Sequence, residues 1–281
     1  MISSSGIAAE PLIRLSAFFG VFLAVALWEA LGPRRRRAFP RRSRWPHNLG
    51  LLALDTLLVR LLVPATALGV ALAAQSQGWG LAHQLAVPQW LAIPLAVIVL
   101  DLTIYFQHVA FHAVPVLWRL HRVHHTDLDF DVTTATRFHP LEILLSAGIK
   151  LATVAAIGAP PIAVLVFEVL LNATAMFNHA NAGLPARVDA ALRWLVVTPD
   201  MHRVHHSILP QETNTNFGFN LPWWDRLFGT YRAQPVAGHE AMTIGIDAFR
   251  SPEDLRLDQL LIQPLRDTPG GYPINRRQEA G

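Results

Sequence analysis

The sequence predicts an all-α integral membrane protein, a helical bundle of about three spans plus a helical hairpin with a cytoplasmic, histidine-rich, metal-binding cap. Of its 281 residues, 52% are hydrophobic and only 15% are charged. The apolar residues gather in long blocks, unlike the mixed pattern of a soluble domain. Eight of the 13 histidines stand in three short motifs. Blocks of this kind predict the spans, and the motifs predict the cap.

Three apolar blocks are candidates for single spans. Residues 12–31 are long enough to cross the hydrocarbon layer as a helix. A cleaved signal peptide is the weaker alternative, because residues 1–10 lack a basic segment. Residues 49–74 form the second block, and residues 89–106 form the third, which leads directly into the first histidine motif.

Two shorter apolar stretches, residues 141–157 and 162–177, flank the sequence GAPP. Each is at the short end for a complete span. We therefore expect a helical hairpin that dips into the bilayer or crosses it and returns. Residues 233–281 contain several prolines and charges, and we expect them to form a soluble C-terminal tail.

A basic segment follows the first block and sets the expected orientation. Its seven arginines are Arg34, Arg35, Arg36, Arg37, Arg41, Arg42 and Arg44. Their position beside a span indicates a cytoplasmic loop rather than a nucleic-acid surface. Counting spans from this loop places every histidine motif on the same cytoplasmic face, which we expect to be that of a bacterial inner membrane.

These features divide the chain into three expected parts. Residues 1–88 hold the N-terminal membrane helices and the basic loop, residues 89–232 hold a catalytic domain, and residues 233–281 hold the tail.

The pentapeptide HRVHH occurs at residues 121–125 and again at 202–206, and HVAFH stands at 108–112. Imidazoles at i, i+3 and i+4 share one face of a helix, and several neutral imidazoles aimed at one point are typical ligands for a transition metal. The chain contains no cysteine, so thiolate ligands are excluded. The eight candidate ligands are His108, His112, His121, His124, His125, His202, His205 and His206. Eight nitrogens exceed what one tetrahedral zinc ion uses, so we expect two metal ions.

Further residues extend this site. His179 ends the returning helix of the hairpin on the same face, and we expect it to be a ninth ligand. Glu168 and Asn178 belong to the same helix and are candidates for supporting hydrogen bonds. Three roles remain possible for His139: a metal ligand, a hydrogen-bonding partner of a ligand, or a helix cap. Asp101, inside the third block, is a candidate catalytic residue that would accept a hydrogen bond from a ligating imidazole. Asn216 is a second candidate, because Asn214 and Asn216 closely follow the second HRVHH and are expected to form hydrogen bonds near it.

The ordered motifs resemble the fatty acid hydroxylase superfamily, which includes sterol desaturases, sphingolipid hydroxylases and alkylglycerol monooxygenase. The resemblance covers about residues 90–232. It is carried by HVAFH at 108–112, HRVHHTD at 121–127, RFHPLE at 137–142, FNHAN at 177–181, PDMHRVHH at 199–206 and NTNFGFNLPWWDRLFGTY at 214–231.

This resemblance implies a membrane oxygenase with two iron ions, O2 as co-substrate and a lipid substrate, such as a sterol, fatty acyl, sphingoid or ether lipid. The product could be an alcohol or an alkene. The sequence departs from many relatives at Val109, where they have arginine. His139-Pro140 is not followed by the glycines of a cytochrome b5 module. Electrons are therefore expected from a separate protein, ferredoxin-like or cytochrome b5-like.

The main alternative from another class is a histidine-rich metal transporter or sensor without oxygenase activity. Transport predicts polar ligands near the middle of the bilayer, whereas here the motifs gather at one interface. A zinc protease is less plausible, because no HEXXH motif occurs.

Overall fold

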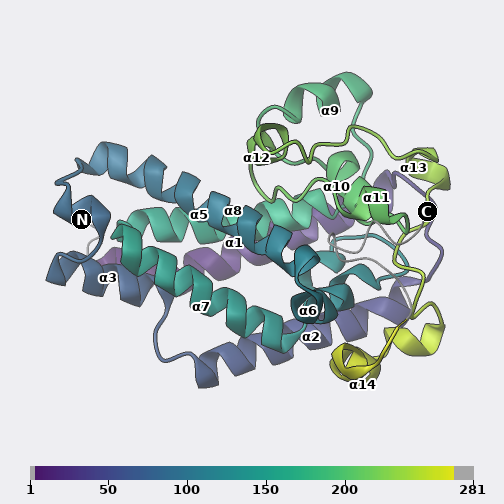
Figure 1. Cartoon of the computed structure of the whole chain (residues 1–281), viewed down its shortest axis with the longest axis horizontal. Coiled ribbons are helices and arrows are strands. Elements are labelled where there is room, and N and C mark those ends of the chain that lie inside the picture. The colour runs from purple at the N-terminus through teal and green to yellow at the C-terminus, as the bar shows by residue number, and fades with distance from the viewer. Residues whose placement is uncertain (1–3, 269–281) are drawn as a thin grey trace.

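A computed structural model describes residues 4–268, and residues 269–281, the end of the expected tail, lie outside the described part. The described chain contains helices and no named strand. Figure 1 shows a bundle of long helices with a cap of short helices and loops at one end. The long helices are α1 (Ser4–Leu31), α2 (Arg41–Leu62), α5 (Gln89–Ala113), α7 (Pro140–Ile157) and α8 (Pro161–Asn178), with the shorter α3 (Ala67–Gln77) and α4 (Leu81–Gln84) at the end opposite the cap.

Five helical segments are long and apolar enough to cross a membrane. This finding agrees with the predicted membrane bundle. Exposed leucines such as Leu12, Leu23 and Leu61 cover the outside of the bundle, where hydrocarbon rather than water would surround them. Small residues, including Ala71, Ala96 and Ala163, occupy the interior and allow the helix backbones to approach closely.

The second predicted block is not one continuous helix. α2 ends at Leu62, and α3 begins at Ala67. Pro64 explains the interruption, because proline lacks an N–H group and disfavours helical backbone in the preceding residue. Val63 accordingly adopts an extended conformation (φ −97°, ψ 112°). The Thr66 hydroxyl then caps α3 by accepting a hydrogen bond from the Gly69 N–H at 3.0 Å.

The predicted hairpin is present as α7 and α8, each 18 residues long. Both helices begin with proline, which suits the first helical position. Gly158 ends α7 with φ +65°, and its backbone touches that of Gly80 so closely that a Cβ on Gly80 would come 2.1 Å from the Gly158 nitrogen. Two glycines therefore let the α7–α8 turn pack against the start of α4.

The cap is built from short elements that follow α5 and α8. They are α6 (Pro115–His125), η1 (Thr134–Thr136), α9 (Ala186–Leu192), α10 (Pro199–His205), α11 (Pro210–Thr213), α12 (Trp223–Leu227), α13 (Gly238–Ala241), η2 (Pro252–Leu255), α14 (Leu257–Ile262) and η3 (Gln263–Leu265). The described part of the expected tail, residues 233–268, is folded onto the cap: α14 packs against α2, and η3 packs against α6.

The basic segment, between α1 and α2, lies at the cap end of the bundle (Figure 1). Arg44 is fully buried, and its guanidinium contacts the carboxylates of Asp127 and Asp131 at 2.6 Å each. Arg34 contacts Asp200 at 3.2 Å. These arginines therefore tie the segment to the cap, a role that the sequence did not indicate.

Candidate metal centre

All nine predicted ligands meet in the cap as two buried groups. The five-histidine group contains His108, His112, His121, His125 and His205. The four-histidine group contains His124, His179, His202 and His206. Within each group the candidate ligand atoms all lie within 4.8 Å of one another. None of the nine residues is more than 6% exposed.

Each copy of HRVHH divides its histidines between the two groups. His121 and His125 enter the five-histidine group, and His124 enters the other. In the second copy, His205 enters the five-histidine group, and His202 and His206 enter the other. Residues i and i+4 are close neighbours in angle around a helix, whereas residue i+3 lies to one side. Each short helix therefore supplies a pair to one group and a single imidazole to the other.

Backbone carbonyls fix four of the imidazole rings through Nδ1. His108 donates to the Phe217 carbonyl at 2.8 Å, and His205 donates to the Thr215 carbonyl at 2.7 Å. His179 donates to the Ala175 carbonyl at 2.8 Å, and His124 to that of Arg137 at 3.3 Å. A carbonyl oxygen can only accept, so Nδ1 carries the hydrogen in each ring and a neutral imidazole presents a lone pair at Nε2.

Two side chains fix two further rings of the five-histidine group. The Glu142 carboxylate accepts a hydrogen bond from Nδ1 of His121 at 2.6 Å. Oδ1 of Asn214 accepts one from Nδ1 of His112 at 3.1 Å, and its amide nitrogen donates to the Pro210 carbonyl at 3.0 Å. Partners of this kind orient metal-ligating histidines and raise their basicity.

Burial keeps the candidate ligands that lie outside the membrane-spanning helices neutral. It lowers the pKa of His121 and His179 to about 3. For His124, His202 and His206, burial and the neighbouring histidines hold the pKa well below the usual value. Neutral imidazole is the form that binds a metal ion.

The inward-facing nitrogens fit a cation. Nε2 of His179 lies 3.1 Å from Nε2 of His124 and 3.1 Å from Nε2 of His202. Because Nδ1 carries the hydrogen in both His124 and His179, two lone pairs face each other at that distance. A positive ion between them would remove this repulsion. In addition, Nε2 of His108, His121 and His205 is buried without a hydrogen-bond partner.

Asp101 does not take the position predicted for it. Its carboxylate accepts hydrogen bonds from Asn220 and Leu221 and, at 2.8 Å, from Nε1 of Trp224. The expected bond to an imidazole is therefore not what the structure shows. Asp101 precedes His108 by seven residues, or about 10 Å of helix, so its carboxylate holds the segment before α12 instead.

Asn216 also holds backbone rather than a ligand. Its amide nitrogen donates to the carbonyls of Met201 and Arg232 at 2.8 Å, and its Oδ1 accepts from the Arg232 N–H at 2.8 Å. It has φ +54°, a left-handed conformation that asparagine tolerates. Asn216 thus joins α10 to the segment that carries the Thr215 and Phe217 carbonyls.

The other three supporting candidates lie at different distances from the site. Asn178 adjoins His179 and donates to the Phe219 carbonyl at 3.0 Å. Glu168 lies farther down α8, where it pairs with Lys150 and with Arg14, so the expected contact with the centre is not what the structure shows. His139 caps α7, because its Nδ1 accepts from the Leu141 N–H at 3.2 Å. Of its three alternatives, the structure shows the cap.

Glu142 was not predicted as a partner of the ligands, whereas Asn214 was expected to form a hydrogen bond near the second HRVHH and holds His112. Glu142 stands in RFHPLE at the start of α7, and Asn214 lies eight residues after the second HRVHH. Their proximity in sequence to the motifs was the only available signal, because each contact joins segments from different parts of the chain.

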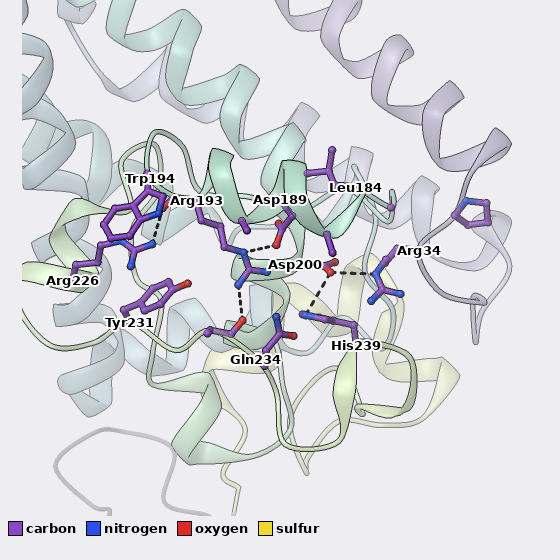
Figure 2. Close-up of a pocket in the computed structure, with 15 residues that line it drawn as sticks. Arg34, Leu184, Asp189, Arg193, Trp194, Asp200, Arg226, Tyr231, Gln234 and His239 are labelled. Atoms are coloured by element: carbon purple, nitrogen blue, oxygen red, sulfur yellow. Dashed lines mark hydrogen bonds and ion pairs between the residues drawn. The ribbon is translucent and has the colours of Figure 1, made fainter.

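A pocket of about 770 Å³ lies on the cap (Figure 2). Arg34, Asp200 and His239 line one side of it, and the Arg226 guanidinium is stacked between Trp194 and Tyr231 at 4.0 Å from each ring. None of the nine candidate ligands lines this pocket. The ion pairs Arg34–Asp200 and Arg193–Asp189 lie in its lining.

Comparison with known proteins identifies the same region. Residues 93–230 match the family described as Fatty acid hydroxylase. The ornithine lipid hydroxylase OlsE of Rhizobium tropici is 29% identical over 148 residues, covering 53% of this chain and 44% of that protein. Alkylglycerol monooxygenase of Homo sapiens is 28% identical over 149 residues, covering 53% of this chain and 32% of that protein.

Cholesterol 25-hydroxylase of Rattus norvegicus is 26% identical over 144 residues, covering 50% of this chain and 47% of that protein. The matched region thus spans less than half of each of these relatives. No solved structure matches the chain significantly. The matched residues contain all nine histidines of the centre, and residues 93–230 are a fatty acid hydroxylase domain.

Proposed function

We propose that this chain is a membrane-bound di-iron oxygenase that uses O2 and external electrons to hydroxylate or desaturate a lipid. The observation that carries the proposal is the pair of buried histidine groups with inward-facing Nε2 atoms. Nitrogen donors without thiolates suit iron. The relatives are named hydroxylases and monooxygenases, which favours hydroxylation over desaturation.

The five-histidine group would hold one iron ion, and the four-histidine group would hold the other. When bound, the irons would supply the reduction of O2 and the oxidation of an unactivated C–H bond. Hydroxylation consumes one O2, two electrons and two protons, inserts one oxygen atom into the substrate and releases the other as water.

The protein's own contribution is to orient the ligands and exclude water. Carbonyls and the side chains of Glu142 and Asn214 fix the rings before a metal arrives, so little reorganisation is needed. Aromatic rings cover the centre: Phe138 stacks on His124 at 4.5 Å, and Phe217 lies 5.1 Å from His112. A dry site protects a reactive oxidant from side reactions.

Electrons would come from a separate protein, since the chain has no cysteine for an iron–sulfur cluster. We infer a ferredoxin-like or cytochrome b5-like donor. The basic segment at the cap end favours a cytoplasmic position for the centre, and we assign it to a bacterial inner membrane.

Iron analysis of histidine variants tests the ligand assignment. We expect His205→Ala and His206→Ala, one from each group, to lose bound iron and activity, and His83→Ala at the opposite end of the bundle to keep both. Full iron retention by both ligand variants would overturn the assignment. Metal uptake by proteoliposomes without O2 consumption would instead favour the transporter.

Lipid mass spectrometry of cells with and without the gene tests the reaction. A lipid that gains one oxygen atom supports hydroxylation, and one that loses two hydrogens supports desaturation. If no lipid changes in either way, the oxygenase proposal fails.

A further inference from the structure

A small pocket of about 250 Å³ lies against the five-histidine group, between α5 and the segment that runs through α12. Tyr105, Phe106 and Val109 of α5 form one wall, and Phe228 and Thr230 form the other. No charged side chain lines it. It is therefore suited to an uncharged, mainly apolar occupant.

The floor of this pocket touches the candidate metal ligands. Phe217, which is fully buried, lies 5.1 Å from the ring of His112 and 5.5 Å from those of His108 and His205. Asn214, also in the floor, holds Nδ1 of His112. An occupant that reaches the floor is thus separated from the ligands by one side chain.

The mouth of the pocket lies on the outside of a span. Phe106 is 49% exposed, Phe228 is 46% exposed, and their rings are 5.1 Å apart. Leu227, beside them, is 70% exposed. Phe106 stands 17 residues after the start of α5, or about 25 Å along it, near the boundary of a hydrocarbon layer about 30 Å thick.

One side of the pocket is held in place by specific contacts. The Tyr105 hydroxyl bonds to the Thr230 hydroxyl at 2.9 Å, and the Tyr105 ring stacks on Phe228 at 5.4 Å. The walls therefore remain joined behind the mouth.

We propose that this pocket is the lateral entrance through which the alkyl chain of a bilayer lipid reaches the metal centre. The assignment rests on the proposed oxygenase function and adds where its substrate binds. The chain enters between Phe106 and Phe228 from the hydrocarbon boundary, passes Val109 and ends against Phe217. An alkyl chain fits the three observations together, since the mouth faces lipid, the walls are apolar and the floor adjoins the ligands.

Photocrosslinking tests this entrance without relying on turnover. The iron-loaded protein, in nanodiscs of phosphatidylcholine, is mixed with a fatty acid that carries a diazirine near its methyl end. After illumination, labelled residues are identified by peptide mass spectrometry. We expect label at residues 105–109 and 217–230 that unlabelled fatty acid displaces.

Val109→Trp fills the pocket, and we expect it to reduce this label about tenfold, because exclusion of two methylene groups already costs that much in occupancy. Val99→Trp is the matched control, since Val99 is 36% exposed on the same helix, and it should leave the label unchanged. Equal labelling of Val109→Trp and wild type, or label spread evenly over the outside of the bundle, would overturn the proposal.

Iron content shows whether Val109→Trp has disturbed the adjacent His108. If Val109→Trp has lost iron, Phe228→Ala is tested in its place. Because this change widens the mouth, we expect the label to shift along residues 105–109. An unshifted pattern would overturn the proposal. Label in the pocket of a protein that makes no oxidised lipid supports the entrance and refutes the oxygenase. Oxidised lipid from a protein whose pocket is unlabelled supports the oxygenase and refutes the entrance.

Discussion

Oε1 of Glu142, in the first turn of α7, lies 2.6 Å from Nδ1 of His121, near the end of α6. Both side chains are buried. This contact joins a membrane helix of the hairpin to the five-histidine group, and among the described contacts Glu142 is the carboxylate that holds a candidate ligand.

We expect Glu142→Gln to weaken metal binding by about 10–100-fold, because partners of ligating histidines contribute by orienting the ring and raising its basicity. Iron titration followed by metal analysis measures the change. Glu253→Gln, at an exposed site on η2, is the matched control and should bind iron as wild type does. Wild-type affinity in Glu142→Gln would show that the carboxylate does not support the site.

Asp101→Asn should separate support of the fold from support of the metal. The Asp101 carboxylate accepts hydrogen bonds from residues 220–224, and bonds to a charged group contribute about 1.5–3 kcal/mol each. We expect a lower melting temperature in detergent with iron content close to wild type. Iron loss as complete as in the histidine variants would contradict this division.

We expect the stability of the fold to depend on the guanidinium geometry of Arg44 as well as on its positive charge. It contacts Asp127 through two nitrogens and Asp131 through a third, and lysine cannot reproduce this geometry. Disruption of a buried ion pair costs about 3–5 kcal/mol, so Arg44→Lys should unfold at a clearly lower denaturant concentration. Arg42→Lys, the same change at an exposed neighbour, should unfold as wild type does.

The raised pKa of Asp225 predicts that the free energy of unfolding depends on pH. Burial raises its pKa to about 6, whereas the unfolded chain titrates near the ordinary value of 3.8. The folded state therefore binds the proton more tightly, and the stabilisation from protonation is complete below about pH 4 and lost as the pH rises through 6. We expect the unfolding free energy of wild type, relative to Asp225→Asn, to fall by about 3 kcal/mol over this range. A difference that is constant with pH would refute the raised pKa.

The membrane helices and the candidate histidine ligands could be predicted from the sequence, because they depend on local spacing or composition. Apolar blocks long enough to span a membrane appear as helices, since an isolated helix in lipid must satisfy its backbone internally. The interruption at Pro64 was also a local effect, although the length of the surrounding block hid it. The HRVHH repeats place imidazoles on one side of a short helix whatever surrounds them.

Contacts between segments far apart in the chain could not be predicted in this way. Nothing in the spacing shows that Arg44 reaches Asp127, 83 residues away, or that Asp101 binds residues 220–224 rather than a histidine. Side chains such as Glu168 share a helix with a ligand, but position along the helix carried Glu168 to Lys150 and Arg14 instead.

The sequence by itself determined which nine histidines would meet, because the motifs and the side of the membrane follow from spacing and from the order of the spans. Only the tertiary structure decided how they divide into groups of five and four. That division depends on the rotation and docking of α6 and α10 against α5 and α8, which is set by packing between segments far apart in the chain and leaves no local trace in the sequence.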